Sequence, residues 1–455
     1  MSRKLVGRIR ESKFRGTESF KLSPAALKPV DTFRIVAKGP SFKPDDVISA
    51  LVDCSRVAGP SGTALSVLSH RASVAADQFY PPQIVEVLSL FGRIGFASSQ
   101  DLFSLIVSRK SDVLSEASPR RIVTLIEAFA NLQLPLFHPA IWPEMRSELV
   151  RVMPQLKRGI STVLRGLSSL GCTDTELVGA LMAQADCLEE SGEIEREYFV
   201  HALEAVSRME KNLIPEKKFS DKKFSTLQNA EILVARKRAG LSGQVSGGDL
   251  LSGLSRYDFA RVMGVLGRSG LKIDQDIIYE RIEELLKDKD FCHRMMPYTL
   301  WNSVLTSDDS LNDFFRLVFS KLVGLDRLAS DKLLALLRTG KVIGADTSEI
   351  EALLSITARQ LSIREARILW EVMPGVVPTT SLPPLIPRGQ EAAELDIETV
   401  GPYSMYKKSE GLQLLAPAYQ VYRPGSLAIR RDMQLRLSAL ERAAGQPIDV
   451  CVSFS

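Results

Sequence analysis

A helical pattern that recurs at a step of 38 residues constrains the fold of this chain more than any other feature. In each copy, large apolar residues occupy a first position and the positions four and seven residues later, and a small residue follows directly. The four clearest sets are Ile84/Leu88/Phe91/Gly92, Ile122/Ile126/Phe129/Ala130, Ile160/Leu164/Leu167/Ser168 and Phe259/Met263/Leu266/Gly267. This spacing predicts stacked helical hairpins, because a single hairpin cannot bury such a face alone.

The repeat has a weaker first copy and an apparent interruption. Val47, Leu51 and Cys54 hold the apolar positions of a copy that begins near residue 44. From Ile160 to the next clear copy at Phe259 there are 99 residues, longer than two repeats, so we expect an insertion after residue 190. We therefore predict a mainly α-helical protein, a right-handed α-solenoid of stacked hairpins followed by a small C-terminal α/β domain.

Changes of composition along the chain give the expected domain limits. Five prolines between residues 372 and 389 exclude a continuous helix there and indicate a linker. Beyond the linker, the segments at 394–400 and 447–454 have the composition of strands, with an amphipathic helix before the second. The expected segments are a basic arm or transit peptide at 1–43, helical repeats at 44–190, a helix with a basic insertion and a Gly/Ser linker at 191–250, helical repeats at 251–371, the Pro-rich linker at 372–390 and an α/β domain at 391–455.

Composition excludes several classes of protein. No run of 18 consecutive apolar residues occurs, which argues against a membrane-spanning helix. The five cysteines are odd in number and dispersed, which indicates a reducing compartment and not a disulfide framework. A net charge of +4 and a pI near 8.7 permit an acidic partner without requiring one.

The N-terminal 40 residues are strongly basic. They hold ten Lys or Arg residues against three acids, together with several serines. This composition is typical of an organellar transit peptide, so we expect the protein in the mitochondrial matrix. The alternative is a basic arm that lies on RNA or on a neighbouring subunit.

Cations that recur with the repeat point to RNA. Arg120 and Arg158 each precede the first apolar residue of a copy by two positions, with Arg121 and Lys157 beside them. Stacking would align these cations in a row that tracks phosphates. A second basic group in and beside the insertion comprises Lys217, Lys218, Lys222, Lys223, Arg236, Lys237 and Arg238. The alternative is a solvated helix face with a basic loop.

The C-terminal segment has an ordered set of features. An acidic, apolar strand leads into a Gly-Pro turn, a Gly-Ser pair then precedes an Arg-rich helix, and a closing strand follows. The residues concerned are Gly401 and Pro402, Gly425 and Ser426, Arg430 and Arg431, and the strand from Ile448 to Val452. This order resembles a RAP domain, and the hairpins resemble octotricopeptide and heptatricopeptide repeats, which are RNA-binding solenoids of organelles. The resemblance implies RNA binding by both parts, with Arg430 and Arg431 among the binding residues.

Three carboxylates on the expected strand raise the question of catalysis. RAP domains resemble a nuclease core, which uses such carboxylates to hold Mg²⁺ and a lysine near the attacking water. Glu394, Asp396 and Glu398 alternate along one face, but Val400 occupies the position of the lysine. Lys407 is expected in a loop. We therefore expect an exposed edge strand and no enzymatic activity.

Neither a metal site nor a cofactor site is expected. The adjacent Cys292 and His293 supply two ligands at most, whereas structural zinc needs four. The glycine-rich stretch at 240–253 lacks the Gly-Lys-Ser/Thr of a phosphate-binding loop.

These observations predict a non-catalytic mitochondrial protein that holds rRNA or mRNA by its backbone. A subunit of the mitochondrial ribosome is the specific hypothesis, with RNA and other proteins of that particle as partners. The alternative is a protein–protein scaffold of another organellar complex, whose concave face grips a helix or an extended tail. Replacing Lys217, Lys218, Lys222 and Lys223 by Ala is expected to weaken RNA association.

Overall fold

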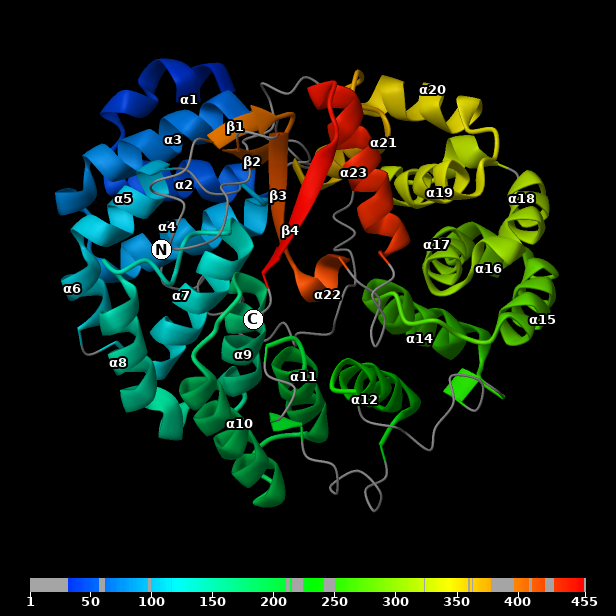
Figure 1. The fold of residues 1–455 in the computed structure, drawn as a ribbon. Helices are drawn as coiled ribbons and strands as arrows, with labels where there is room; N and C mark the ends of the chain where they lie inside the picture. Colours follow the sequence, from blue (N-terminus) through cyan, green and yellow to red (C-terminus); the bar gives the residue numbers. More distant parts are fainter. Residues whose placement is uncertain are drawn as a thin grey trace, which may run out of the picture.

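Helices follow an arc in the computed structural model, and a small sheet lies in the opening between its two arms (Figure 1). The arc runs from α1 at the upper left, through α10 to α12 at the bottom, to α20 at the upper right. The structure describes residues 32–56, 62–96, 100–115, 117–209, 213–214, 224–240, 250–251, 253–322, 324–358, 361, 363–377, 397–408, 411–421 and 429–453. No helix in these ranges has the length and apolar character needed to cross a membrane.

The helices of the arc form two layers, of which the inner one is continuous. Each inner helix packs on the next inner helix along the chain. The inner helices are α2 (Pro44–Cys54), α4 (Pro81–Ile94), α7 (Pro119–Leu132), α9 (Gly159–Leu170), α11 (Arg196–Val206), α12 (Thr226–Arg238), α14 (Arg256–Ser269), α17 (Met296–Thr306), α19 (Ser330–Ile343) and α21 (Ile363–Val372). The predicted α-solenoid is confirmed.

The outer layer consists of helices of more varied length, from 5 residues in α6 to 16 in α10. Its members are α1 (Thr32–Lys38), α3 (Gly62–Val74), α5 (Gln100–Ser108), α6 (Lys110–Leu114), α8 (Trp142–Val152), α10 (Thr175–Glu190), α15 (Gln275–Leu286), α16 (Lys289–Arg294), α18 (Asn312–Ser320) and α20 (Ser348–Thr357). Single 3-10 turns lie at Gly39–Ser41, Ala76–Gln78, Met153–Gln155, Asp309–Leu311 and Leu325–Arg327. The apolar positions predicted from the repeat are buried between the layers; Ile84, Leu88, Phe91, Ile122, Ile126 and Phe129 have no exposed surface.

Local sequence sets where the inner helices begin and end. α7 begins after Ser118, whose side chain accepts a hydrogen bond from the backbone N–H of Arg121, and Pro119 occupies its first turn. α9 ends at Gly171, which has a φ of 76°, a conformation that glycine adopts without strain. Such caps satisfy the backbone groups that a helix leaves without intrahelical partners.

The small residue of the repeat allows neighbouring inner helices to approach closely. A Cβ atom added to Gly92 would lie 3.1 Å from the Cβ of Asn131 on the next inner helix. At Gly267 the added atom would lie 2.8 Å from the Cα of Asn302, also on the next inner helix. Because both contacts join corresponding ends of successive helices, the inner helices run parallel and their N-termini share one edge of the arc.

Arginines of the outer layer fasten several hairpins at their open ends. Each arginine donates to a backbone carbonyl in the loop that precedes the inner helix of its own hairpin. The two helices of a hairpin are antiparallel, so this loop lies beside the end of the outer helix. The contacts are Arg71 to Phe42 at 2.6 Å, Arg109 to Ala76 at 2.5 Å and to Phe79 at 3.1 Å, Arg151 to Ala117 at 2.6 Å, and Arg281 to Leu254. These bonds supply donors to carbonyl groups that lie outside the α-helices.

The expected insertion after residue 190 does not interrupt the inner layer. α11 and α12 lie between α9 and α14, and each packs on its neighbours. Phe199, Leu203 and Val206 on α11 are buried and have the spacing of the repeat, with Ser207 at the small position. Phe199 lies 39 residues after Ile160. The segment therefore contains a copy of the repeat that the sequence comparison overlooked.

The C-terminal unit is a four-stranded sheet with two helices. It comprises β1 (Ile397–Val400), β2 (Tyr403–Lys408), β3 (Gly411–Pro417), α22 (Ala418–Val421), α23 (Arg431–Ala444) and β4 (Ile448–Ser453). The strand order is β1-β2-β3-β4, antiparallel except for the parallel pair β3 and β4. The predicted first strand, helix and closing strand are confirmed. The expected loop around Lys407 is wrong, because Lys407 lies on β2.

Candidate nucleic-acid interface

The inner helices α4, α7, α9 and α14 each present a stripe of exposed and partly exposed residues to the inside of the arc. The stripe lies opposite the apolar face that packs on the outer layer, so its residues line the concave surface. On the helices α4, α7, α9 and α14 its residues are Glu86, Ser89, Arg93, Thr124, Glu127, Asn131, Thr162, Arg165, Ser169, Arg261, Gly264 and Arg268. None of these residues is among the exposed large apolar side chains of the described chain. The concave surface over these four helices is therefore polar.

Arginines from successive inner helices gather at the middle of the concave surface. We call Arg165, Arg208, Arg238 and Arg268, with Arg430 from the C-terminal unit, the concave arginine cluster. They come from α9, the end of α11, α12, α14 and the residue before α23. Burial lowers the pKa of Arg238, and the charges of Arg208 and Arg430 lower it further. Burial also lowers the pKa of Arg268, and the charges of Arg165 and Arg208 add to that shift, so these arginines interact electrostatically.

Glu204 holds two members of this cluster. A carboxylate oxygen lies 2.7 Å from the guanidinium of Arg208 on the same segment and 2.5 Å from that of Arg238 on the next inner helix. Burial alone would raise the pKa of Glu204, but the charges of Arg208 and Arg238 outweigh it and lower the pKa to about 2. Glu204 therefore stays ionised at neutral pH and ties α11 to α12.

Arg165 and Arg268 differ from the other arginines of the cluster. Among the described residues, neither has a carboxylate within the 4.0 Å of an ion pair, and both are exposed. Desolvation lowers the pKa of Arg268; Glu231 and Glu204 oppose this shift, whereas Arg165 and Arg208 add to it. Arg165, Arg208 and Arg268 therefore lie close enough for their like charges to repel one another, which a bound anion relieves.

The predicted row at the N-terminal edge of the inner layer is present, but most of its cations already have partners. Lys157 lies 3.6 Å from Glu193, and Arg158 pairs with Glu195 and lies over the ring of Tyr198 at 5.6 Å from its centre.

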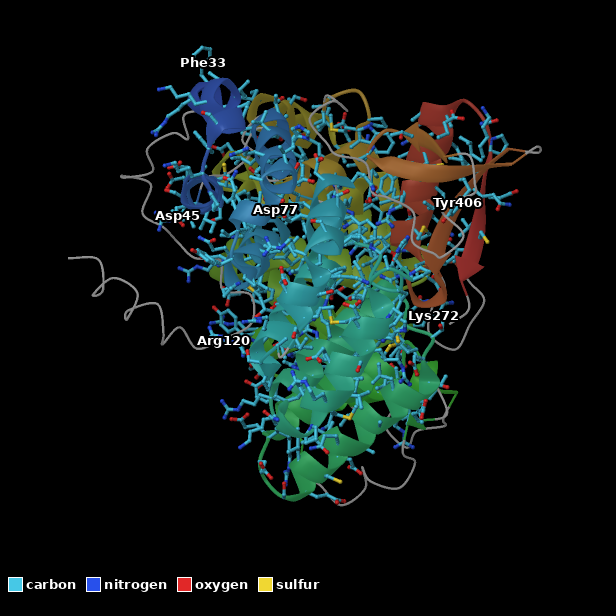
Figure 2. All side chains as sticks on the ribbon, turned by 90° about the vertical axis from the view of Figure 1, so that its left-hand side faces the viewer. Phe33, Asp45, Asp77, Arg120, Lys272 and Tyr406 are labelled. Carbon is cyan, nitrogen blue, oxygen red and sulfur yellow. The ribbon has the colours of Figure 1, made fainter. Side chains whose placement is uncertain are left out.

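At the same edge, the guanidinium of Arg121 lies 3.5 Å from the backbone oxygen of Val113. Arg120 is exposed, with no ion-pair partner among the described residues. Figure 2 places Arg120 on the side opposite Tyr406 of the sheet. The ion pairs of Lys157 and Arg158 are exposed and therefore weak, so these cations can exchange their carboxylate partners for phosphates.

The second predicted basic group divides into three parts. Lys217, Lys218, Lys222 and Lys223 lie outside the described residues. Lys237 is exposed at the end of α12, and Arg236 is partly buried there. The Arg238 side chain is 7% exposed and pairs with Glu204, so it supports the solenoid instead of offering a free surface cation.

Arg430 and Arg431 are buried in this structure, unlike the surface cations that the sequence led us to expect. Arg430 lies against Asp432, with atoms 2.9 Å apart, and its side chain touches Gly270 after α14. Arg431 donates to the backbone oxygen of Val304 at 2.9 Å and also bonds to Asp309. Both arginines therefore attach the C-terminal unit to the concave side of the arc.

Glu371 on α21 is the main link between this unit and the solenoid. Its carboxylate accepts from the Tyr403 hydroxyl at 2.5 Å and from Arg436 at 2.9 Å, and lies 3.8 Å from Arg338. We call these four residues the C-terminal latch. Trp370 packs so tightly on Gly401 that an added Cβ would lie 2.0 Å from its ring. The unit is thus held by buried polar contacts as well as by apolar packing.

The carboxylates considered for nuclease chemistry are incompletely described. Glu398 lies on β1, and the Lys407 ammonium lies 3.7 Å away on β2; both side chains are largely exposed. Glu394 and Asp396 lie outside the described residues. In the part of the chain that the structure describes, no three His, Cys, Asp or Glu residues come close enough to hold a metal ion.

One protein family matches part of this chain. The family model RESC6, described as RNA-editing substrate-binding complex 6 protein, matches residues 19–213. That range reaches from the N-terminal arm through α11 and so includes Arg120, Arg158 and Arg165. No curated protein matches the chain. The matched family is not one of the repeat or RAP families that the sequence resembles, so those two resemblances stay predictions.

Proposed function

We propose that this chain is a non-catalytic RNA-associated protein that holds RNA by its backbone within a mitochondrial ribonucleoprotein assembly. The observation that carries the proposal is the polar concave surface, on which Arg93, Arg165, Arg261 and Arg268 have no ion-pair partner among the described residues. Exposed guanidinium groups along a curved surface suit phosphates, which they bind with release of counterions. The match to a family named for RNA-editing substrate binding supports the same class of ligand.

The second candidate function is a protein–protein scaffold, and the polar concave surface is evidence against its gripping a partner helix there. A concave solenoid face that grips a helix offers apolar residues for the apolar side of that helix. The inner stripes of α4, α7, α9 and α14 have none that are large and exposed. Exposed apolar residues lie elsewhere, such as Phe33 on α1 and Ile356 on α20. A scaffolding role would therefore use the ends or the outer layer of the arc.

The assembly and its compartment are part of the proposal. The matched family is named for an RNA-editing complex, so we favour an assembly of that kind over the mitochondrial ribosome. The basic N-terminal residues support import into the mitochondrial matrix.

Direct binding of RNA to the purified full-length chain tests the proposal. We expect a labelled single-stranded RNA of mixed sequence to bind, with an affinity that falls steeply as salt rises, because the contacts are to phosphates. We expect no cleavage of the RNA in the presence of Mg²⁺. Failure to bind RNA at low salt would refute RNA association. Cleavage that requires Mg²⁺ and is lost in Glu398→Gln would refute the non-catalytic role.

A further inference from the structure

We infer that the concave arginine cluster is a phosphate-binding site for unpaired RNA, with Arg165 and Arg268 as its contacts and the C-terminal unit as its boundary. This inference rests on the proposed function and names the site and the form of the RNA. Neither residue stands out in the sequence, because each is an isolated cation among apolar and small residues of its helix and not part of a run of cations.

The first step in the argument is the balance of charge within the cluster. Glu204 is shared between Arg208 and Arg238, and Asp432 pairs with Arg430. Arg165 and Arg268 have no ion-paired carboxylate among the described residues; Glu231 acts on Arg268 from beyond ion-pair distance and lies 3.5 Å from His201. Two guanidinium groups therefore remain available on a surface that already carries positive charge. A phosphate between them relieves the repulsion and gains charge-assisted hydrogen bonds.

The second step is the rigidity of the site. Arg165 lies on α9, and its neighbour Gly166 packs on Ile126 of α7 so closely that an added Cβ would lie 2.5 Å from Ile126 Cγ2. Arg268 lies on α14, which packs on α17 at Gly267. The helices that carry the two arginines are thus fixed by close contacts, and Glu204 joins the two helices that lie between them. Preorganised donors of this kind bind an anion with little ordering cost.

The third step concerns the form of the RNA. The C-terminal unit lies between the two arms of the arc in the view of Figure 1 and toward one side of the arc in Figure 2, and its Arg430 lies against Gly270 directly after α14. The cluster is therefore bounded on one side by folded protein that the C-terminal latch holds in place. Double-stranded RNA is a stiff helix that proteins recognise across two successive minor grooves, which needs a long open surface. A single strand bends and presents its phosphates one at a time, so it suits this bounded surface.

The test compares matched double variants of the full-length chain. Arg165→Ala/Arg268→Ala removes two cations from the cluster, whereas Lys287→Ala/Lys321→Ala removes two exposed cations at the ends of α15 and α18 in the outer layer. For a single-stranded probe, each phosphate contact contributes about 0.7 to the slope of log affinity against log salt. We expect the cluster variant to lose about 1.4 from the magnitude of that slope, and the outer-layer variant to keep the wild-type value. Arg165→Lys/Arg268→Lys should retain most of the slope, because it retains the charges.

The same probe annealed to its complement tests the form of the RNA. We expect the duplex to bind at least tenfold more weakly than the single strand and to compete poorly with it. Equal affinity for the duplex overturns the assignment to unpaired RNA. An unchanged slope in the cluster variant, with RNA binding by the wild type intact, overturns the site and leaves the proposed function standing. Absence of binding by the wild type refutes the proposed function itself.

Discussion

At the scale of single residues, arginine has several roles in this chain, and its surroundings decide which one it takes. Arg109 supports a hairpin, Arg238 lies in a buried ion pair, and Arg165 faces the open concave surface. Sequence alone placed Arg238 among the RNA contacts and did not identify Arg165. A local run of cations is visible in a sequence, whereas the carboxylate that neutralises one of them, here Glu204, comes from another helix. For this reason the candidate site was predicted only in part.

The arginine that fastens a hairpin contributes to stability through the carbonyl groups that it satisfies. In Arg109→Ala, the backbone oxygen of Phe79 loses the donor Arg109, and that of Ala76 keeps only the backbone N–H of Phe79; both residues are buried. We expect the free energy of unfolding to fall by about 1–3 kcal/mol. Chemical denaturation measures the change. Arg93→Ala is the control, since Arg93 is exposed and has no ion-pair partner among the described residues; it should stay within about 0.5 kcal/mol of wild type. Equal effects of the two substitutions would contradict this role of Arg109.

The ion pairs of Glu204 give stability a defined dependence on pH. The folded-state pKa of Glu204, about 2, lies below its ordinary value of 4.5, so the folded state binds the proton more weakly than the unfolded state. The contribution is therefore complete above pH 4.5 and is lost as pH falls from 4.5 through about 2. Glu204→Gln lacks this titration. We expect it to be less stable than wild type at neutral pH, with a difference that narrows in that acidic window. Denaturation at several pH values measures it, and a constant difference would contradict the assignment.

At the scale of elements, the 38-residue spacing predicted most of the inner layer, because the apolar spacing within each inner helix follows directly from its packing on the outer layer. One element was missed and another was not assigned to the repeat, both for physical reasons. A short helix was expected where α12 lies, but α12 carries Asn229, Arg236 and Lys237 among its apolar residues, which obscures the repeat in the sequence. β2 has no period-two pattern, since the adjacent Met405 and Tyr406 are both buried and Lys407 is exposed, so its six residues could not be recognised as a strand from alternation.

Two glycines of α14 allow the effect of close helix packing on stability to be distinguished from that of helix propensity. Gly267→Ala would bring a Cβ within 2.8 Å of the Asn302 backbone and within 2.7 Å of its Cβ, so α14 and α17 must move apart. We expect a loss of about 1–3 kcal/mol in the free energy of unfolding. Gly264→Ala is the matched control, since its nearest neighbours would be 4.0 Å away. There we expect a gain of about 0.5–1 kcal/mol, the usual benefit of alanine over glycine within a helix. Thermal or chemical denaturation gives both values, and the same sign for both would contradict the packing argument.

At the scale of the whole molecule, the C-terminal unit closes what would otherwise be an open solenoid. The latch joins it to α19 and α21, while Arg430 and Arg431 join it to the segments that follow α14 and α17. The sequence predicted a distinct unit after the Pro-rich linker but gave no sign of this docking, because the hydrogen-bonded residues are between 32 and 127 positions apart. The bounded concave surface is a product of this docking, so RNA binding and the position of the C-terminal unit are coupled.

Removing the central carboxylate of the latch tests that coupling. Glu371→Ala leaves Arg338 and Arg436 without their shared partner at a site where the Glu371 side chain is only 4% exposed. Breaking a buried ion pair by removing one partner costs about 3–5 kcal/mol. We expect the unit to detach while the solenoid stays folded. Hydrogen exchange should then rise in β1 to β4 and α23 but not in α4, α7 or α9. Glu349→Ala, an exposed acid on α20, is the control and should leave exchange unchanged. Faster exchange throughout the arc would mean that the latch stabilises the whole fold instead of one interface.

If the C-terminal unit bounds the cluster, its detachment should also change RNA binding. We expect the difference in affinity between single-stranded and duplex RNA to be smaller in Glu371→Ala than in the wild type.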